Sequence, residues 1–146
     1  MITENQEDYL GTIWRIEEDN KQISKIVDTK KGSSITEISK RMKVSKPSAT
    51  EMLKNLKKQN LVNYKKYGKT TLTKKGKTES KNIIRKHRII ETFLDSTLKI
   101  TKSKIHTLAH KLEHAFDDES IEKIYNLIGK PTHDPHGKVI PAGGKI

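Results

Sequence analysis

The most informative absence from this sequence is cysteine, of which its 146 residues contain none. The chain therefore cannot form a disulfide, and it offers no thiolate as a metal ligand. Any metal site in it must be built from imidazole and carboxylate groups, which suit divalent first-row metals such as manganese, iron, nickel and zinc.

Apolar residues are also scarce, since hydrophobic side chains make up 32% of the sequence and charged side chains 33%. A chain with so small an apolar supply gains from burying further surface in a dimer. No apolar run approaches the length of a membrane span, and residues 1–10 are polar and acidic, unlike a secretory signal. We therefore expect a cytoplasmic protein without a membrane partner.

Positive charge is concentrated in one third of the chain. Residues 37–86 contain 16 Lys and Arg but only three acidic residues, a charge of +13, whereas the whole chain carries +12. Such a local excess indicates a polyanionic partner. A lysine-rich solvated surface explains the charge alone equally well, so the local residue pattern has to decide between the two interpretations.

The basic segment and the residues before it have a helical pattern. Apolar residues at helical spacing predict a first helix over residues 8–18 and a second over residues 34–42, with Ser34 or Thr36 as its N-cap. A tight turn at residues 43–44 leads to a third helix over residues 47–60. Two short helices joined by so few residues predict a helix-turn-helix.

A β-hairpin is predicted after the helix-turn-helix, because side chains alternate through residues 61–73 on both sides of a Gly68-Lys69 turn. A hairpin in this position is a wing. The charge maximum coincides with this motif, which favours DNA binding over a packing unit that merely has this shape.

Residue roles at a DNA interface follow from general geometry. The N-terminal end of the second helix of such a motif enters the major groove, where hydroxyl groups bond base edges, while lysines contact phosphates. The candidate DNA-binding residues are Thr36, Ser45, Lys46, Pro47, Ser48, Thr50, Lys54, Lys65, Lys66 and Lys69.

Histidine and glutamate recur at one-face spacing in the second half of the chain. His87 and Glu91 are four residues apart on a helix predicted over residues 74–98. A further helix over residues 103–116 places four such residues along one stripe, namely His106, His110, Glu113 and His114. Facing helices that offer His and Glu pairs are how helical proteins build divalent metal sites. His133 and His136 fall in a turn-rich tail, where they could be ligands but are rather expected in a surface turn.

The sequence resembles the diphtheria toxin repressor and manganese transport regulator family along nearly its whole length. The matching strings are residues 7–10, 44–53, 72–76, 85–88 with Glu91, 110–114 and 134–137. The resemblance implies a mainly α homodimer. Each subunit has a winged helix-turn-helix DNA-binding domain (three helices plus a β-hairpin wing) over residues 1–73. An all-helical metal-binding and dimerisation domain follows over residues 74–146.

The resemblance also implies two metal sites and a function. One site uses the positions of His87, Glu91 and His106, and the other those of Asp8, His110, Glu113 and His114. The positions of Ser45 and Pro47 touch bases in the family. The metal acts as corepressor, and the loaded dimer binds a palindromic operator. The expected function is repression of metal-uptake genes by a regulator that Mn²⁺ or Fe²⁺ activates.

This chain mixes the ligand layouts of two branches of the family. Iron-type members have Met at the position of Asp8 and Cys at that of His110. Manganese-type members have Asp at the first position but Glu at the second, a further Glu in place of Gly11, and no His at the position of His106. The sequence therefore leaves the metal open. We expect the two-domain form, without the SH3-like third domain that contributes ligands in many iron-type members.

Two other functional classes are weighed against this expectation. The alternative is a metal-independent winged-helix regulator in which the histidine stripe is merely solvent-exposed surface. Measuring DNA binding during a metal titration distinguishes it from a metal-dependent regulator. A metalloenzyme is disfavoured, because the sequence has no HExxH motif, no glycine-rich phosphate loop and no cysteine nucleophile. We therefore expect a protein that is not an enzyme and has no small organic substrate.

Overall fold

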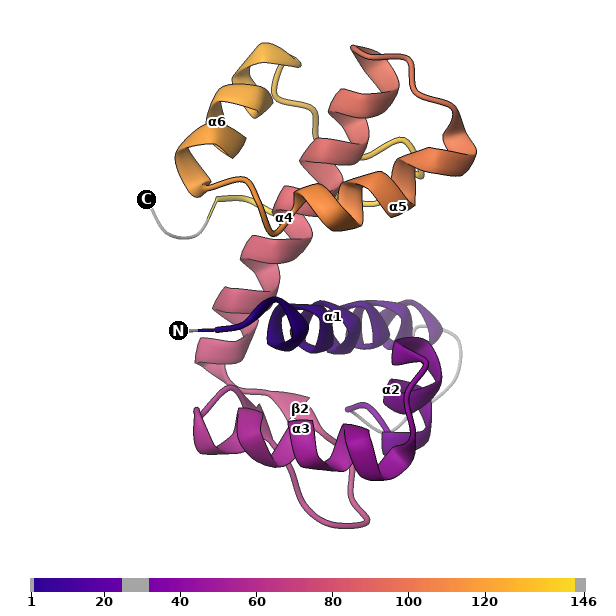
Figure 1. Cartoon of the computed structure of the whole chain (residues 1–146), viewed down its shortest axis with the longest axis vertical. Coiled ribbons are helices and arrows are strands. Elements are labelled where there is room, and N and C mark those ends of the chain that lie inside the picture. Colours follow the sequence, from indigo (N-terminus) through magenta and orange to yellow (C-terminus); the bar gives the residue numbers. More distant parts are fainter. Residues whose placement is uncertain (1, 25–31, 144–146) are drawn as a thin grey trace. The chain divides into compact units, whose positions relative to one another are not determined.

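The computed structural model describes residues 2–24 and 32–143, which form two compact units, Met1–Ser80 and Lys81–Ile146. The helices are α1 (Glu4–Ser24), α2 (Ile35–Met42), α3 (Lys46–Lys58), α4 (Lys74–Ser96), α5 (Lys102–Leu112) and α6 (Asp118–Leu127). The strands are β1 (Val62–Asn63) and β2 (Thr71–Leu72) (Figure 1). The mainly α fold class predicted from the sequence is confirmed.

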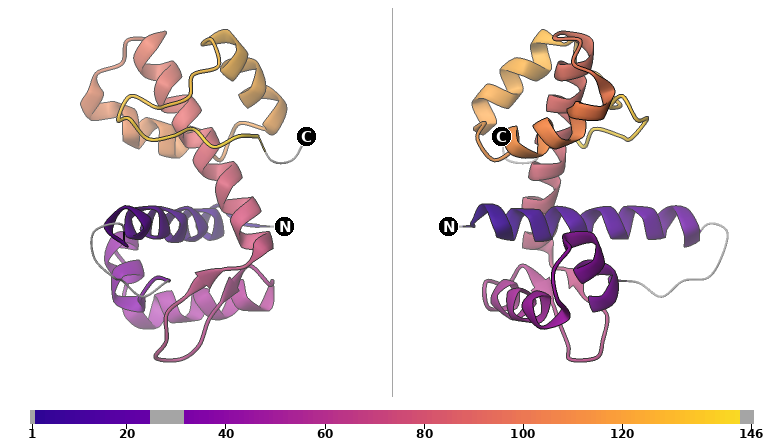
Figure 2. Two further views of the ribbon diagram at one scale, coloured as in Figure 1. Left: turned by 180° about the vertical axis from the view of Figure 1, so that it is seen from behind. Right: turned by 45° about the vertical axis from the view of Figure 1, so that its right-hand side comes forward.

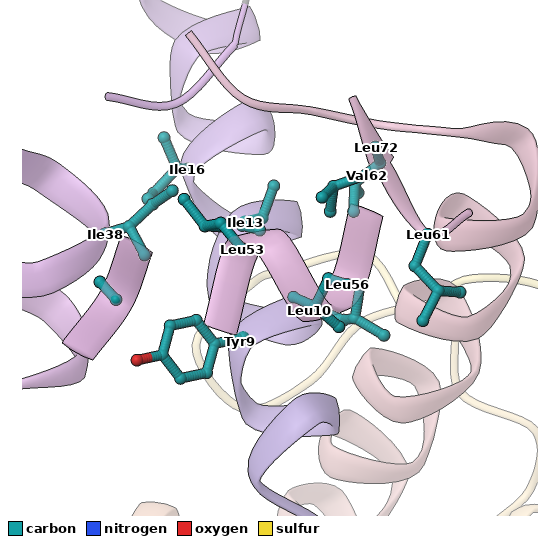
Figure 3. Packing of buried hydrophobic residues seen from close by; sticks show 11 residues of the cluster. Tyr9, Leu10, Ile13, Ile16, Ile38, Leu53, Leu56, Leu61, Val62 and Leu72 are labelled. Carbon is teal, nitrogen blue, oxygen red and sulfur yellow. The ribbon is translucent and has the colours of Figure 1, made fainter. Parts of the chain in front are cut away.

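The core of the first unit gathers side chains from α1, α2, α3 and the hairpin (Figure 3). Leu10 and Ile13 of α1 lie against Leu53 and Leu56 of α3, and all four are at most 1% exposed. Ile38 closes the cluster from α2 and is fully buried. The apolar stripes that predicted these helices are therefore the surfaces that pack together, and α3 is held with its other face in solvent.

Local caps define where the helices of the motif begin and end. Ser34 Oγ accepts a hydrogen bond from the Glu37 N–H at 3.1 Å, so Ser34 is the N-cap of α2. Lys43 ends α2 in the left-handed conformation at φ 57°, which produces the predicted tight turn. Ser45 then caps α3 by accepting from the Ser48 N–H at 3.2 Å.

The first helix is longer than its apolar stripe predicts. It begins at Glu4 rather than near Asp8, because Thr3 and Gln6 form a capping box. The Gln6 N–H donates to Thr3 Oγ1 at 3.2 Å, and the Thr3 N–H donates to Gln6 Oε1 at 3.0 Å. The sequence carries this signal, although hydrophobic periodicity does not detect it.

The wing is a hairpin, but the predicted Gly68-Lys69 turn is wrong. Its paired strands have two residues each, with Val62 opposite Leu72, and residues 64–70 connect them. The chain reverses over residues 65–68, where the Gly68 N–H donates to the Lys65 carbonyl at 2.9 Å and Tyr67 has φ 63°. The connection is therefore a long basic loop that projects from the first unit (Figure 2).

The second unit packs α5, α6 and the tail against the later part of α4. Its core contains Ile89 and Ile90 of α4, Ile105 of α5 and Ile121 of α6, each at most 2% exposed. Helix α4 starts in the first unit and continues into the second. The predicted domain division at residue 73 coincides with the start of α4 and stays a prediction. Among the described residues, no helix is long and apolar enough to cross a membrane.

Candidate metal centre and nucleic-acid interface

Two residues of α4 form the buried part of a His and Glu cluster. His87 Nε2 lies 3.1 Å from Glu91 Oε1, and the two side chains are only 2% and 3% exposed. One turn into α5, His106 places its Nδ1 3.2 Å from the same nitrogen of His87, although its own side chain is 67% exposed. One ligand atom from each of the three residues lies within 4.8 Å of the others. This cluster is therefore compact enough to surround one cation.

In this cluster, neighbouring groups shift the pKa values of His87 and Glu91 in the direction opposite to burial. Burial by itself lowers the pKa of His87, but hydrogen bonds to Glu113 and Glu91 outweigh it and raise that pKa above 6.5. Burial would raise the pKa of Glu91, yet its interactions with His106 and His87 bring that pKa down from 4.5 to about 2. Glu91 is therefore a carboxylate at neutral pH, as a metal ligand has to be.

A second group forms at the end of α5. Helix α5 stops at Leu112, but the Glu113 N–H still donates to the Ala109 carbonyl at 2.9 Å, so the turn keeps helical geometry. Glu113 Oε1 lies 3.0 Å from His110 Nδ1 and 3.6 Å from His114 Nε2. Its side chain is 3% exposed, and His114 is 6% exposed. The carboxylate is therefore held inside the unit by two imidazoles.

The two groups are joined by one short contact. His87 Nδ1 lies 2.6 Å from Glu113 Oε2, which is a hydrogen-bond distance between two side chains that are both almost completely buried. His87 thus faces Glu91 and His106 with one ring nitrogen and Glu113 with the other. The family resemblance implied the members of each group but not this connection.

The tail brings a histidine to Glu91 that we expected at the surface. His136 Nδ1 lies 3.4 Å from Glu91 Oε2, and Glu91, Asp134 and His136 form a further group of possible ligands. Asp134 Oδ1 accepts from the backbone N–H groups of His136 and Lys138, at 2.9 and 2.8 Å, and so shapes the turn. His136 is 57% exposed and lies in a turn, as expected, and its contact with Glu91 agrees with the alternative that it is a ligand.

Two arginines of α4 hold this tail in place. Arg88 donates to the Val139 carbonyl at 2.7 Å, and Arg85 donates to the Pro141 carbonyl at 2.7 Å. Arg85 also makes hydrogen bonds to both carboxylate oxygens of Glu122 on α6. By contrast, the described hydrogen bond of the His133 side chain is to its neighbour Thr132, at 2.9 Å.

A buried carboxylate oxygen supports a divalent ion in this cluster, independently of the spacing of its residues in the sequence. Glu91 Oε2 is buried and accepts no hydrogen bond from any described residue. An unsatisfied buried carboxylate oxygen is costly unless a cation or a donor reaches it. This oxygen lies 3.4 and 3.7 Å from the Nδ1 atoms of His136 and His106, so a shared ion would satisfy it together with those nitrogens.

Asp8 is the predicted ligand that belongs to the first unit. It lies on α1, partly buried, directly before the core residues Tyr9 and Leu10. The grouping of Asp8 with His110, Glu113 and His114 stays a prediction from the sequence.

The residues predicted to contact bases lie at the exposed start of α3. Ser45, Lys46, Pro47 and Ser48 are exposed, and Thr50 is half-buried on the next turn. Pro47 occupies the first turn, where its missing N–H costs no hydrogen bond. Thr36 is exposed at the start of α2, and Lys65, Lys66 and Lys69 are exposed on the wing loop. Apart from Thr50 and Lys54, which lie further along α3, these residues lie at the starts of α2 and α3 and on the wing loop, and the Lys54 side chain is 55% exposed.

Lysines converge between α3 and the wing. A groove of about 490 Å³ there is lined by Glu51, Lys54, Asn55, Lys57, Lys58, Tyr64, Lys65 and Lys66. Glu51 pairs with Lys54 at 3.5 Å, which leaves an excess of positive charge in the groove. Helical spacing alone does not show that Lys58 shares this groove with the wing.

Comparisons with known proteins agree with the architecture of both units. The iron dependent repressor N-terminal DNA binding domain matches residues 1–69. The metal binding and dimerisation domain of the iron dependent repressors matches residues 73–142. An HTH-type transcriptional regulator of Methanocaldococcus jannaschii, itself uncharacterised, is 35% identical over 84% of this chain and 91% of its own.

Solved structures with similar folds include two manganese-responsive proteins. A manganese-dependent transcriptional repressor in complex with manganese is 32% identical with a TM-score of 0.79, over 93% of this chain and 58% of its own. The manganese regulator SloR is 35% identical with a TM-score of 0.78, over 95% and 60%. The chain thus spans about three fifths of the length of these two proteins.

A hypothetical protein from Sulfolobus solfataricus matches over its entire length. It is 29% identical with a TM-score of 0.70, and the match covers 97% of this chain and 100% of that one. The relatives therefore include a chain with the same extent as well as longer ones. With both family domains matched in order along its described length, the chain belongs to the iron dependent repressor family.

Proposed function

We propose that this chain is a DNA-binding transcriptional repressor that a divalent metal activates. The observation that carries the proposal is the buried cluster of His87, Glu91 and Glu113, which concentrates carboxylate and imidazole groups in a unit that follows a basic winged helix. Burying carboxylates costs folding free energy unless partners compensate their charge, and Glu91 Oε2 still has no hydrogen-bond donor among the described residues. Metal binding is the use that suits this set of donors.

The DNA-binding unit would recognise the base sequence of DNA with the side chains at the start of α3. Ser45, Ser48 and Thr50 offer hydroxyl groups to base edges, and Pro47 offers apolar surface to a thymine methyl group. Lysines of the groove and the wing loop would hold phosphates, which supplies affinity and register but no sequence readout.

The metal-binding unit would hold metal ions at two groups of residues. His110, Glu113 and His114 form one, with Asp8 added on the sequence prediction. His87, Glu91 and His106 form the other, to which His136 and Asp134 bring further donors. The ion supplies positive charge that neutralises carboxylates which the fold holds close together. Mn²⁺ or Fe²⁺ are the proposed physiological ions, and Zn²⁺, Co²⁺ or Ni²⁺ are proposed substitutes in vitro.

A homodimer on a palindromic operator completes the proposal. The second unit exposes Leu98, Leu127 and Val139 by 52%, 71% and 57%, which is apolar surface that a partner subunit could cover. Two recognition helices have to stand about one helical turn of DNA apart. A ligand from α1 would make that spacing depend on metal, and DNA would then tighten metal binding by the same factor.

The test is metal-dependent binding to the promoter region of the chain's own gene. Fluorescence anisotropy with increasing Mn²⁺ or Fe²⁺ should show tighter binding for the wild type. Asp8→Ala and Glu113→Ala should fold normally but lose that stimulation.

Glu119→Ala is the matched control, because Glu119 is 79% exposed on α6 and pairs only with Lys123 among the described contacts. It should respond to metal like the wild type. Equal DNA binding with and without metal in the wild type would instead establish the metal-independent regulator.

A further inference from the structure

The contact between His87 and Glu113 connects two groups of metal-binding residues that are otherwise separate. His87 Nδ1 and Glu113 Oε2 are 2.6 Å apart, and both side chains are at most 3% exposed. At that distance the two atoms share a proton and leave no room for an ion between them, since metal–ligand bonds of about 2.1 Å separate neighbouring ligand atoms further. The contact is therefore a hydrogen bond rather than half of a shared coordination sphere.

The two ring nitrogens of His87 consequently have different roles. Nε2 faces Glu91 Oε1 at 3.1 Å and His106 Nδ1 at 3.2 Å, which is the side open to an ion. A neutral imidazole that offers one nitrogen to a metal keeps its proton on the other. Nδ1 then donates to Glu113 Oε2.

The other oxygen of Glu113 faces the second group. Oε1 lies 3.0 Å from His110 Nδ1 and 3.6 Å from His114 Nε2, so this oxygen is the one presented to an ion there. The side chain of Glu113, in the turn after α5, can adopt several rotamers. Among the described contacts, His87 is the residue that holds its other carboxylate oxygen, Oε2. The orientation of Glu113 as a ligand therefore depends on a residue of another helix.

We propose that His87, besides facing its own group, is a positioning residue for the ion held by His110, Glu113 and His114, through the bond from Nδ1 to Glu113. This inference rests on the proposed metal sites. Hydrogen bonds of this kind to a ligand change metal affinity by about 10- to 100-fold when removed. The bond from His87 should therefore contribute to an affinity at a site that His87 does not itself touch.

A background variant isolates that site. Glu91→Gln, His106→Ala and His136→Ala together remove the carboxylate of Glu91 and the two imidazoles beside it, while leaving Glu113, His110 and His114 intact. Mn²⁺ binding to the full-length background chain, followed by the electron paramagnetic resonance of free Mn²⁺, then reports only the remaining group.

Two substitutions of His87 in this background distinguish the roles of its two ring nitrogens. Asparagine carries its amide nitrogen at the same number of bonds from Cα as Nδ1, and glutamine at the same number as Nε2. His87→Asn can therefore still donate to Glu113, whereas His87→Gln places its donor on the other side. We expect Mn²⁺ affinity within about 3-fold of the background for His87→Asn, and a loss of about 10- to 100-fold for His87→Gln.

Several results would overturn the inference. Equal affinities for the two variants, whether lowered or unchanged, would show that the bond to Glu113 does not position this ligand. Thermal unfolding of both variants, which have similar volumes, checks that a lost fold does not mimic lost affinity. A background chain that is folded but binds no Mn²⁺ would overturn the proposed metal site and this inference together. Equal affinities in chains that do bind Mn²⁺ would overturn only the inference.

Discussion

The residues proposed to contact DNA are exposed and are positioned by near neighbours in the sequence, whereas the residues proposed to hold metal are mostly buried and are positioned by distant ones. Ser45 is placed by a hydrogen bond from Ser48, three residues away. His87 is placed by Glu113, which is 26 residues away. In the first unit, contacts between residues close in sequence thus position side chains that face solvent. The second unit brings together side chains from different helices.

Charge divides the two regions in the same way. The excess of +13 over residues 37–86 covers α3, the wing and the first part of α4, while the remainder of the chain is almost neutral. Exposed lysines act at long range and are weakened by salt. Buried carboxylates and imidazoles act at short range and respond to geometry. The difference implies that salt and lysine substitutions should act mainly on DNA binding, whereas substitutions of the buried residues should act on metal binding and, through the proposed coupling, on the stimulation of DNA binding by metal.

Salt should have the largest effect, and it should act on DNA binding. If 6 to 10 phosphates are contacted, operator affinity should fall by about 10³- to 10⁵-fold between 50 and 200 mM salt. Lys54→Ala should weaken binding to all sequences alike and reduce the salt slope by about 1. Anisotropy titrations over a salt series measure both quantities.

Lys104→Ala is the control for this experiment, since Lys104 is an exposed lysine of α5 in the other unit. Its slope should match the wild type. A flat salt profile for the wild type would show that the basic face of the first unit is not where DNA docks.

Helix caps should give a smaller effect that distinguishes the two units. Ser34→Ala removes the side-chain bond to the Glu37 N–H and should lower the free energy of unfolding by about 1 kcal/mol. Thr101 occupies the same position before α5 but makes no side-chain cap bond, so Thr101→Ala should cost clearly less. Urea denaturation followed by circular dichroism compares the two, and an equal loss would mean that the cap of α2 does not stabilise it.

The sequence predicts the first unit well because its signals are local. Periodic apolar residues and Ser45 locate α2 and α3 to within about two residues, as helix boundaries generally allow. The wing turn was misplaced because Gly68 was taken as the turn itself, whereas Tyr67 adopts the left-handed conformation and the chain reverses over residues 65–68. A non-glycine residue at positive φ leaves no clear trace in the sequence.

The second unit is predicted only in part. Spacing of four residues brings His87 and Glu91 to one face, and the family resemblance names the members of each group. Neither shows that His136 reaches Glu91, which is 45 residues earlier, because the approach depends on a turn shaped by Asp134 and on Arg88 holding the tail. Neither shows the bond from His87 to Glu113, because a contact between helices depends on how they pack.

The most direct test of the central claim is to locate the metal. Crystals grown with Mn²⁺ and measured at the manganese absorption edge should show an anomalous peak at coordination distance from Glu113 Oε1 and His114 Nε2, with a second peak beside Glu91. Well-ordered Glu113, His114 and Glu91 side chains in such crystals, without an anomalous peak near any of them, would contradict the account.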